Sequence, residues 1–173
     1  MKPGPAIILL LLFIASISCE KFPDPDPGPL YPENSIYFNS FESPSDTIGW
    51  YGISTEYFME DAPVGGGKQS VQISGGCIIP HAYVWIDPLD KDCSLVLRCW
   101  GKNMSHGGSV RLVMDDPWVT VNIPVQETSW TYYSCEDTLH YVAGSRLRIE
   151  LNSGGIMASA MRVDQLEITK LDP

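Results

Sequence analysis

Hydrophobic and polar residues alternate in short runs from residue 35 to the C-terminus, and residues that favour turns separate the runs. A period of two is typical of strands with one buried face, and no window of about 11 residues or more has a helical period. Many short strands with regular turn signals predict an all-β, antiparallel β-sandwich. The predicted strands cover residues 35–41, 50–53, 70–73, 77–86, 94–100, 110–114, 119–125, 130–135, 146–151 and 161–169.

The last predicted strand contains a slip in its alternation. Met161 and Val163 fall on one face, and the apolar positions resume at Leu166 and Ile168, one residue out of phase. An extra residue of this kind indicates a β-bulge. We expect the bulge to turn Asp164 towards a partner that offsets the burial of its charge, such as a cation or an arginine.

The first 18 residues have the features of an export signal. Lys2 precedes an apolar run over residues 6–15, which is too short for a permanent membrane span, and small residues follow. Cys19 comes directly after them, and this arrangement resembles the bacterial lipoprotein box. The resemblance implies a lipoprotein signal peptide at 1–18 and cleavage before Cys19. Fatty acids such as palmitate would then be attached to Cys19. The alternative is a plain signal peptide with an incidental cysteine.

Residues 19–34 are acidic and rich in proline, a composition that favours an extended chain and cannot join a sheet. We predict a tether there and a β-sandwich domain at 35–173. Acidic residues behind the cysteine also resemble the surface-export signals of Bacteroidetes lipoproteins. Removing the leader leaves 10 basic and 21 acidic residues, a net charge of −11. Such a charge argues against nucleic acid as a partner, because phosphate contacts need basic patches.

Four segments resemble, in the same order, parts of carbohydrate-binding modules with a galactose-binding-like jelly roll. Residues 38–42 followed by Trp50 are similar to the opening Asn-x-x-Phe-Glu strand, and 67–73 to the Gly-Lys-x-Ser-Leu-x-Ile strand. Residues 94–102 resemble the mid-chain strand, and 161–170 the closing strand with its buried aspartate. The resemblance implies the jelly-roll fold, which hosts glycan binders, adhesion modules and enzyme appendages alike.

The same resemblance implies a structural calcium ion. Glu42 and Asp164 would supply carboxylate oxygens, and residues 67–70 would supply main-chain oxygens, a mixed oxygen set that suits calcium. The alternative is that Asp164 pairs with an arginine and that Glu42 is solvated.

Aromatic residues lie opposite the core face of the predicted strand 77–86, where they could stack on pyranose rings, although large aromatics are also common in cores. If the neighbouring strands share a sheet with it, the same face carries polar groups suited to sugar hydroxyls or an acidic glycan. The alternative is a solvated face with paired charges and no binding role. The predicted ligand-binding residues are His81, Tyr83, Trp85, Arg98, Trp100 and Asn122.

Besides Cys19, the chain has Cys77, Cys93, Cys99 and Cys135. An even number in an exported chain predicts two disulfides. Cys93 and Cys99 would lie about 20 Å apart on one strand, whereas bridged Cα atoms are roughly 4.4 to 6.8 Å apart. Two arrangements stay open: Cys77 with Cys93 and Cys99 with Cys135, or Cys77 with Cys99 and Cys93 with Cys135. Buried free thiols are the alternative.

The sequence contains no Gly-x-Ser-x-Gly motif, no metal-ligand spacing of histidines and no acid pair typical of glycosidases. We therefore expect a protein that is not an enzyme: a lipid-anchored glycan-binding protein of the bacterial outer membrane, on the cell surface or its periplasmic side. The alternative is a structural or protein-interaction subunit of an envelope complex, with no sugar ligand.

Overall fold

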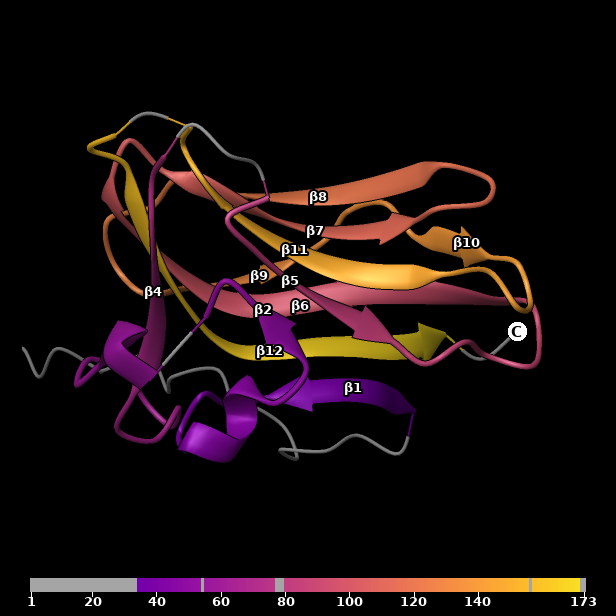
Figure 1. Ribbon diagram of the computed structural model, residues 1–173, viewed down its shortest axis with the longest axis horizontal. Coiled ribbons are helices and arrows are strands. Elements are labelled where there is room, and N and C mark those ends of the chain that lie inside the picture. The colour runs from indigo at the N-terminus through magenta and orange to yellow at the C-terminus, as the bar shows by residue number, and fades with distance from the viewer. Residues whose placement is uncertain (1–33, 54, 77–79, 156, 172–173) are drawn as a thin grey trace, which may run out of the picture.

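The computed structural model describes residues 34–53, 55–76, 80–155 and 157–171. Two antiparallel sheets pack face to face, and most of the strands run along the long axis of the molecule, whereas β4 crosses it (Figure 1). The predicted all-β antiparallel sandwich is therefore confirmed. Cys19, Cys77, the predicted leader and all of the tether except Asn34 lie outside the described residues.

Sheet A has seven strands in the order β10-β6-β12-β4-β3, with β1 also beside β12 and β9 also beside β6. Sheet B has the order β2-β5-β11-β7-β8. Two short 3-10 helices, η1 (Pro44–Thr47) and η2 (Thr55–Tyr57), lie between β1 and β3. The strands of sheet A are β1 (Ser35–Asn39), β3 (Phe58–Met59), β4 (Ser70–Ser74), β6 (Cys93–Ser105), β9 (Thr131–Ser134), β10 (Leu139–Tyr141) and β12 (Ala160–Leu171). Those of sheet B are β2 (Trp50–Tyr51), β5 (Ala82–Ile86), β7 (Gly108–Met114), β8 (Val119–Val125) and β11 (Leu147–Ser153).

The core lies between the sheets and is built from the alternate positions of each strand. On β5, Ala82, Val84 and Ile86 are buried, whereas Tyr83 and Trp85 lie on the outer face. The inward positions of the long strands are almost all aliphatic, so burial of their side chains supplies the main driving force for folding. None of the described residues forms a helix long and apolar enough to cross a membrane.

Strand β12 contains the predicted bulge. Its pairing with β6 shifts register between Asp164 and Glu167, and Gln165 adopts a left-handed φ of 44°. The Gln165 side chain donates a hydrogen bond of 3.0 Å to the Gly65 carbonyl, which ties the bulge to the loop before β4. Asp164 is fully buried there, as the slip in the sequence indicated.

Several strands differ from those predicted. The sequence pattern missed β3 and β10, which have two and three residues, and β6 extends past residue 100 to Ser105. The strand predicted at 77–86 begins only at Ala82 within its described part.

Cys93, Cys99 and Cys135 are free thiols. Each predicted disulfide arrangement required a bridge between two of these three, so both were wrong for this structure. The pairing of β6 with β9 sets Cys99 opposite Tyr133, while the Cys135 thiol approaches the Asn122 carbonyl at 3.7 Å. Burial raises the pKa of the Cys99 thiol, which keeps it protonated.

Asp61, in the loop after β3, connects several elements on the outer side of sheet A. Its carboxylate accepts hydrogen bonds from Lys102 Nζ at 3.0 Å, Trp130 Nε1 at 3.0 Å and the Arg162 guanidinium. Burial acts to raise the pKa of Asp61, but these hydrogen bonds outweigh it and hold the pKa below its ordinary value. The cluster therefore stabilises the fold at neutral pH and loses that contribution as the pH falls through the lowered pKa.

We expect Asp61→Asn to lower the free energy of unfolding by about 2 kcal/mol, because it removes charge-assisted hydrogen bonds from partly buried partners. Urea denaturation at neutral pH measures the change. Asp90→Asn is the matched control, since Asp90 is exposed and the same substitution there should cost less than about 0.5 kcal/mol. Equal losses in the two variants would contradict a structural role for Asp61.

Candidate functional site

The outer face of sheet B carries a row of aromatic side chains. Strand pairing sets Tyr51 opposite Tyr83, and their rings stack with centroids 4.8 Å apart and an interplanar angle of 13°. Trp85 meets Tyr83 edge to face at 6.3 Å. Trp118, in the turn between β7 and β8, continues the row and is 66% exposed. We call these four residues the aromatic platform; its two ends, Tyr51 at 57% and Trp118, are its most exposed residues.

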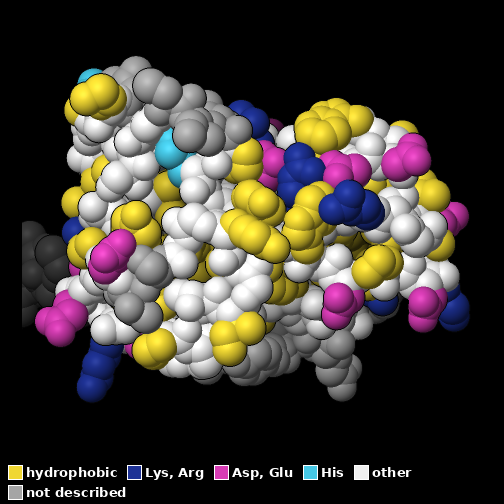
Figure 2. Space-filling view, viewed as in Figure 1, with side chains coloured by type: hydrophobic (Ala, Val, Ile, Leu, Met, Phe, Trp, Pro, Cys, Tyr) yellow, Lys and Arg dark blue, Asp and Glu magenta, His cyan; other side chains and the backbone are white. Residues whose placement is uncertain are grey.

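Two arginines lie within the platform. The Arg146 guanidinium carbon is 4.0 Å from the centre of the Trp85 ring, and that of Arg148 is 5.1 Å from Trp85 and 5.2 Å from Trp118. These distances are within the range of cation–π attraction. Figure 2 looks onto this face and shows Lys or Arg side chains between hydrophobic groups over β5 and hydrophobic groups beside β8.

Carboxylates neutralise one of these arginines. Arg148 donates to Asp115 at 2.5 Å and to the buried Glu150 at 2.8 Å. Since the three groups are largely shielded from water, the pairing offsets the cost of removing each charge from solvent. Arg148 is therefore held rigidly between Trp85 and Trp118.

The platform continues into polar groups on β7, β8 and β11. Strand register sets Arg111 opposite Glu150 of β11 on one side and Asn122 of β8 on the other, and its Nε donates to Asn122 Oδ1 at 3.4 Å. Asn152 is 3% exposed, and neither its Oδ1 nor its Nδ2 has a hydrogen-bond partner among the described residues. Asn152 and Arg111 both line a hollow of about 320 Å³, where an unpaired amide could receive a ligand hydroxyl.

The structure places Tyr83, Trp85 and Asn122 together on this face of sheet B. His81 lies at its end, where Nδ1 accepts a hydrogen bond from the Ser153 N–H at 3.2 Å and Nε2 is 3.4 Å from the Gly76 carbonyl. Both ring nitrogens are therefore near main-chain partners, so the histidine has a structural role at the start of β5.

Arg98 and Trp100 do not join this group. Their strand, β6, belongs to sheet A, so the condition that the neighbouring strands share a sheet with β5 is not met for β6. Arg98 donates to Thr169 at 2.7 Å, and Trp100 packs against Tyr132 of β9 at 5.6 Å. They form a separate surface on the opposite side of the sandwich.

The sequence-based prediction missed Tyr51, Trp118 and Arg148 as site residues. Each falls at an outward position of an alternating run, which was a usable signal. What the sequence lacked was the strand order, which places β2 and β11 beside β5 and puts β8 in the same sheet, next to β7.

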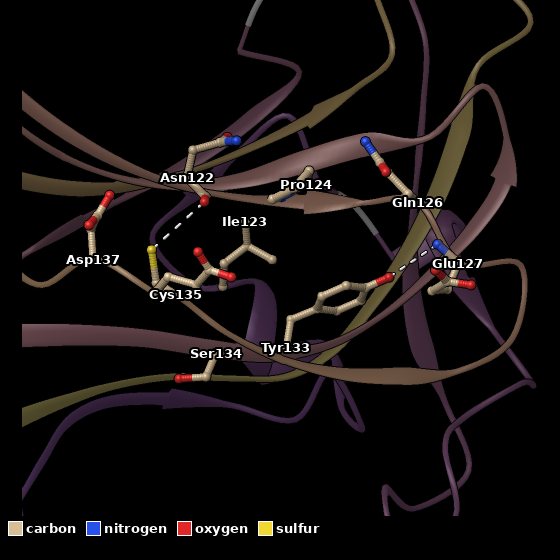
Figure 3. A pocket seen from close by; sticks show the side chains of 10 residues that line it. Asn122, Ile123, Pro124, Gln126, Glu127, Tyr133, Ser134, Cys135 and Asp137 are labelled. Atoms are coloured by element: carbon tan, nitrogen blue, oxygen red, sulfur yellow. Dashed lines mark hydrogen bonds between the residues drawn. The ribbon is translucent and has the colours of Figure 1, made fainter.

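A groove of about 390 Å³ separates β8 from β9 at one edge of the sandwich (Figure 3). The Tyr133 hydroxyl accepts a hydrogen bond from the Glu127 N–H at 3.1 Å, and the Asn122 side chain points away from Cys135. The rim is acidic, and its one aromatic ring is partly buried, so the groove offers a poorer stacking surface than the aromatic platform. Its lining residues are Asn122, Ile123, Pro124, Gln126, Glu127, Tyr133, Ser134, Cys135, Glu136 and Asp137.

Glu42 and Asp164, the predicted calcium ligands, both border the glycine turn at residues 65–67. Glu42 accepts hydrogen bonds from the N–H groups of Lys68 and Gln69 at 3.0 and 2.9 Å. A Cβ atom at position 66 would collide with Asp164 Oδ2, and one at position 67 with the Glu42 carboxylate. Glycine is therefore required where the turn passes between the two acids.

Only one of the two carboxylate oxygens of Asp164 has a hydrogen-bond partner among the described residues. Its Oδ1 accepts a hydrogen bond from the Gln165 N–H at 2.7 Å, whereas Oδ2 is buried and has no partner among the described residues. Burial, with a smaller contribution from the nearby Glu42 charge, raises the pKa of Asp164 to about 8. An unpaired buried carboxylate oxygen beside a second carboxylate is a donor set that a hard cation would satisfy.

The main chain around this pair differs from the prediction. The groups of residues 68 and 69 that face Glu42 are N–H donors, not the expected carbonyl oxygens. Within the described ranges, no three His, Cys, Asp or Glu side chains lie close enough together to hold a metal ion. The side chains fit a calcium site with two carboxylate ligands, so the remaining ligands would be main-chain or water oxygens.

No protein-family model matches the chain, and no curated protein matches it. Solved structures do resemble it. The CBM22-1 xylan-binding domain of Paenibacillus barcinonensis Xyn10C has a TM-score of 0.57 and 18% sequence identity, over 80% of this chain and 96% of that domain. This chain shares the β-sandwich fold of that domain.

The CBM22-1 and GH10 modules of Clostridium thermocellum Xyn10B, complexed with xylohexaose, give a TM-score of 0.56 and 12% identity. That match covers 82% of this chain but 29% of the other, which also contains the GH10 module. The tandem CBM22-1-CBM22-2 domain of the Paenibacillus enzyme gives a TM-score of 0.57 and 18% sequence identity. That match covers 80% of this chain and 46% of the tandem domain. Identities this low establish the shared fold and leave the function to be argued from the site.

Proposed function

We propose that this protein is a non-catalytic carbohydrate-binding module that takes a polysaccharide chain across the outer face of sheet B. The observation that carries the proposal is the aromatic platform, whose exposed ends, Tyr51 and Trp118, lie on the same face as Tyr83 and Trp85. Flat rings stack on the apolar faces of pyranose units, and the polar groups beside them suit sugar hydroxyls. The structural neighbours include a xylan-binding domain and a module complexed with xylohexaose, which supports a glycan of this class as the ligand.

Affinity electrophoresis tests this proposal with the purified protein in gels that contain xylan, mixed-linkage β-glucan or another neutral polysaccharide. We expect at least one polymer to retard the protein. No retardation in any gel, together with co-purification of a stoichiometric protein partner, would overturn the proposal in favour of a structural subunit of an envelope complex.

Calcium is proposed to stabilise the module by binding between Glu42 and Asp164. Bound calcium would neutralise both carboxylates and link the bulge of β12 to the turn at 65–67. The buried, unpaired Oδ2 of Asp164 supports this assignment. The site lies away from the aromatic platform in the opposite sheet, so its role would be structural.

The anchoring at Cys19 is likewise a proposal, supported by the sequence of the leader alone. Mass spectrometry of the mature protein from its native membrane would show an N-terminus at Cys19 that carries acyl chains. A mature N-terminus at any other residue, or an unmodified Cys19, would contradict lipid anchoring and an outer-membrane location.

A further inference from the structure

Arg146 occupies an unusual position on the aromatic platform. Its guanidinium lies 4.0 Å from the centre of the Trp85 ring, the shortest of the cation–π distances on this face. A guanidinium stacked in this way covers part of a ring that would otherwise stack on a sugar. The arrangement also leaves its N–H donors free to bond in the plane of the guanidinium.

Among the described residues, the charge of Arg146 has no carboxylate partner. Arg148, two residues away, is neutralised by Asp115 and Glu150. Within the part of the chain that the structure describes, no acidic side chain pairs with Arg146 or with Arg111. Arg146 is also solvent-exposed, so a ligand can reach its donors.

Arginines gather on this face of an otherwise acidic protein. The chain has a formal net charge of −10, yet three of its five arginines, Arg111, Arg146 and Arg148, lie on this one face. An acidic protein repels an anionic polymer except where positive charge is concentrated. A neutral glycan could accept hydrogen bonds from Arg146, but only an anionic glycan would also pair with its charge.

A purely structural role explains Arg148 but not Arg146. The paired carboxylates and the two tryptophans hold Arg148 in place, and it serves as the support between Trp85 and Trp118. Arg146 adds a second cation on the same ring, and no carboxylate of the described part of the chain forms an ion pair with it. A planar guanidinium with unused donors is the group that binds a carboxylate in a bidentate manner.

We propose that the natural ligand is a carboxylate-bearing polysaccharide, in which Arg146 pairs with a uronate while neighbouring sugars stack on Tyr51 and Trp118. The inference rests on the proposed function, because it assigns the ligand class of the same face. Arg111 and Asn122 lie farther along this face and would contact the sugar hydroxyls.

Affinity electrophoresis with a matched pair of polymers tests this inference: a uronate-bearing xylan, and the same xylan after its carboxyl groups have been reduced to alcohols. We expect the full-length protein to bind the native polymer about 10-fold more tightly, with a difference that shrinks as the salt concentration rises. Arg146→Gln should bring the ratio of the two affinities close to one. Lys68→Gln, which removes the same charge from an exposed turn outside the platform, should leave the ratio unchanged.

Equal affinity of the unmodified protein for the two polymers would overturn the uronate inference while leaving the proposed glycan-binding function intact. An equal loss of preference in the Lys68→Gln variant would also overturn it, because overall charge and not Arg146 would then set the preference. Failure to bind either polymer or any neutral glycan would remove the proposed function itself.

Discussion

The double variant Tyr51→Ala, Trp118→Ala is expected to lose about 100-fold in affinity for the polysaccharide that the unmodified protein binds. Each ring would bury roughly 60 Å² of apolar surface against a sugar, worth about 1.5 kcal/mol, or about 10-fold, at roughly 25 cal/mol per Å². The residues lie at opposite ends of the aromatic platform and are not in contact, so their effects should add. Isothermal titration calorimetry with a soluble oligosaccharide of the retarding polymer measures the loss.

Tyr132→Ala is the matched control for this experiment. Tyr132 is an exposed aromatic residue, 47% accessible, on the outer face of sheet A next to Trp100. Its replacement should leave affinity within about 2-fold, and thermal melts should show that both variants remain folded. If Tyr132→Ala lost affinity while the double variant kept it, the glycan would bind to sheet A, and the assignment of the platform would be wrong.

The inward and outward positions of each strand could be predicted from the sequence, because that assignment depends on local alternation. Tyr83 and Trp85 were expected to lie on the other face of their strand from Val84, and they do. The bulge at Asp164 was equally local, since one extra residue in the apolar pattern was enough to reveal it. Sequence reasoning works here because the period of two directly reports which side chains a strand buries.

The membership of strands in sheets could not be predicted in the same way. Strands β5 and β6 are consecutive in the chain, yet one belongs to sheet B and the other to sheet A. Arg98 and Trp100 were therefore grouped with Tyr83 on a face that they do not share. Pairing between distant segments decides this, and alternation carries no information about it.

The predictions of the short strands and of the disulfides failed for related reasons. Strand β10, at Leu139–Tyr141, is too short to show a period and exists because it pairs with the start of β6. The predicted disulfides followed from a count of cysteines, but the register of β9 against β6 decides what lies beside Cys99 and Cys135. Non-local register is thus the common missing quantity.

Asp164→Asn is expected to have opposite effects with and without calcium. In a chelator at pH 8 and above, the variant should be more stable than the unmodified protein by on the order of 4 kcal/mol, because it no longer buries a charged, unpaired carboxylate. With calcium at about 100 times its dissociation constant, the unmodified protein should gain about 2.7 kcal/mol. The variant should gain little, since it lacks one of the two carboxylate ligands.

The sign of the pH dependence follows from the raised pKa. Because folded Asp164 has a pKa of about 8, against an ordinary value of 3.8, the native state holds its proton more tightly than the unfolded chain does. In chelator, the unmodified protein should therefore be most stable at low pH, as far as this group is concerned, and should lose that stability as the pH rises from about 4 to 8. Asp164→Asn should remove this slope, whereas Asp87→Asn, at an exposed position, should leave it. Denaturation curves measured across this pH range give the free energy of unfolding at each pH. If that free energy changed with pH equally in all three proteins, and none of them responded to calcium, Asp164 would have a partner of its own. No cation would then be needed between Asp164 and Glu42.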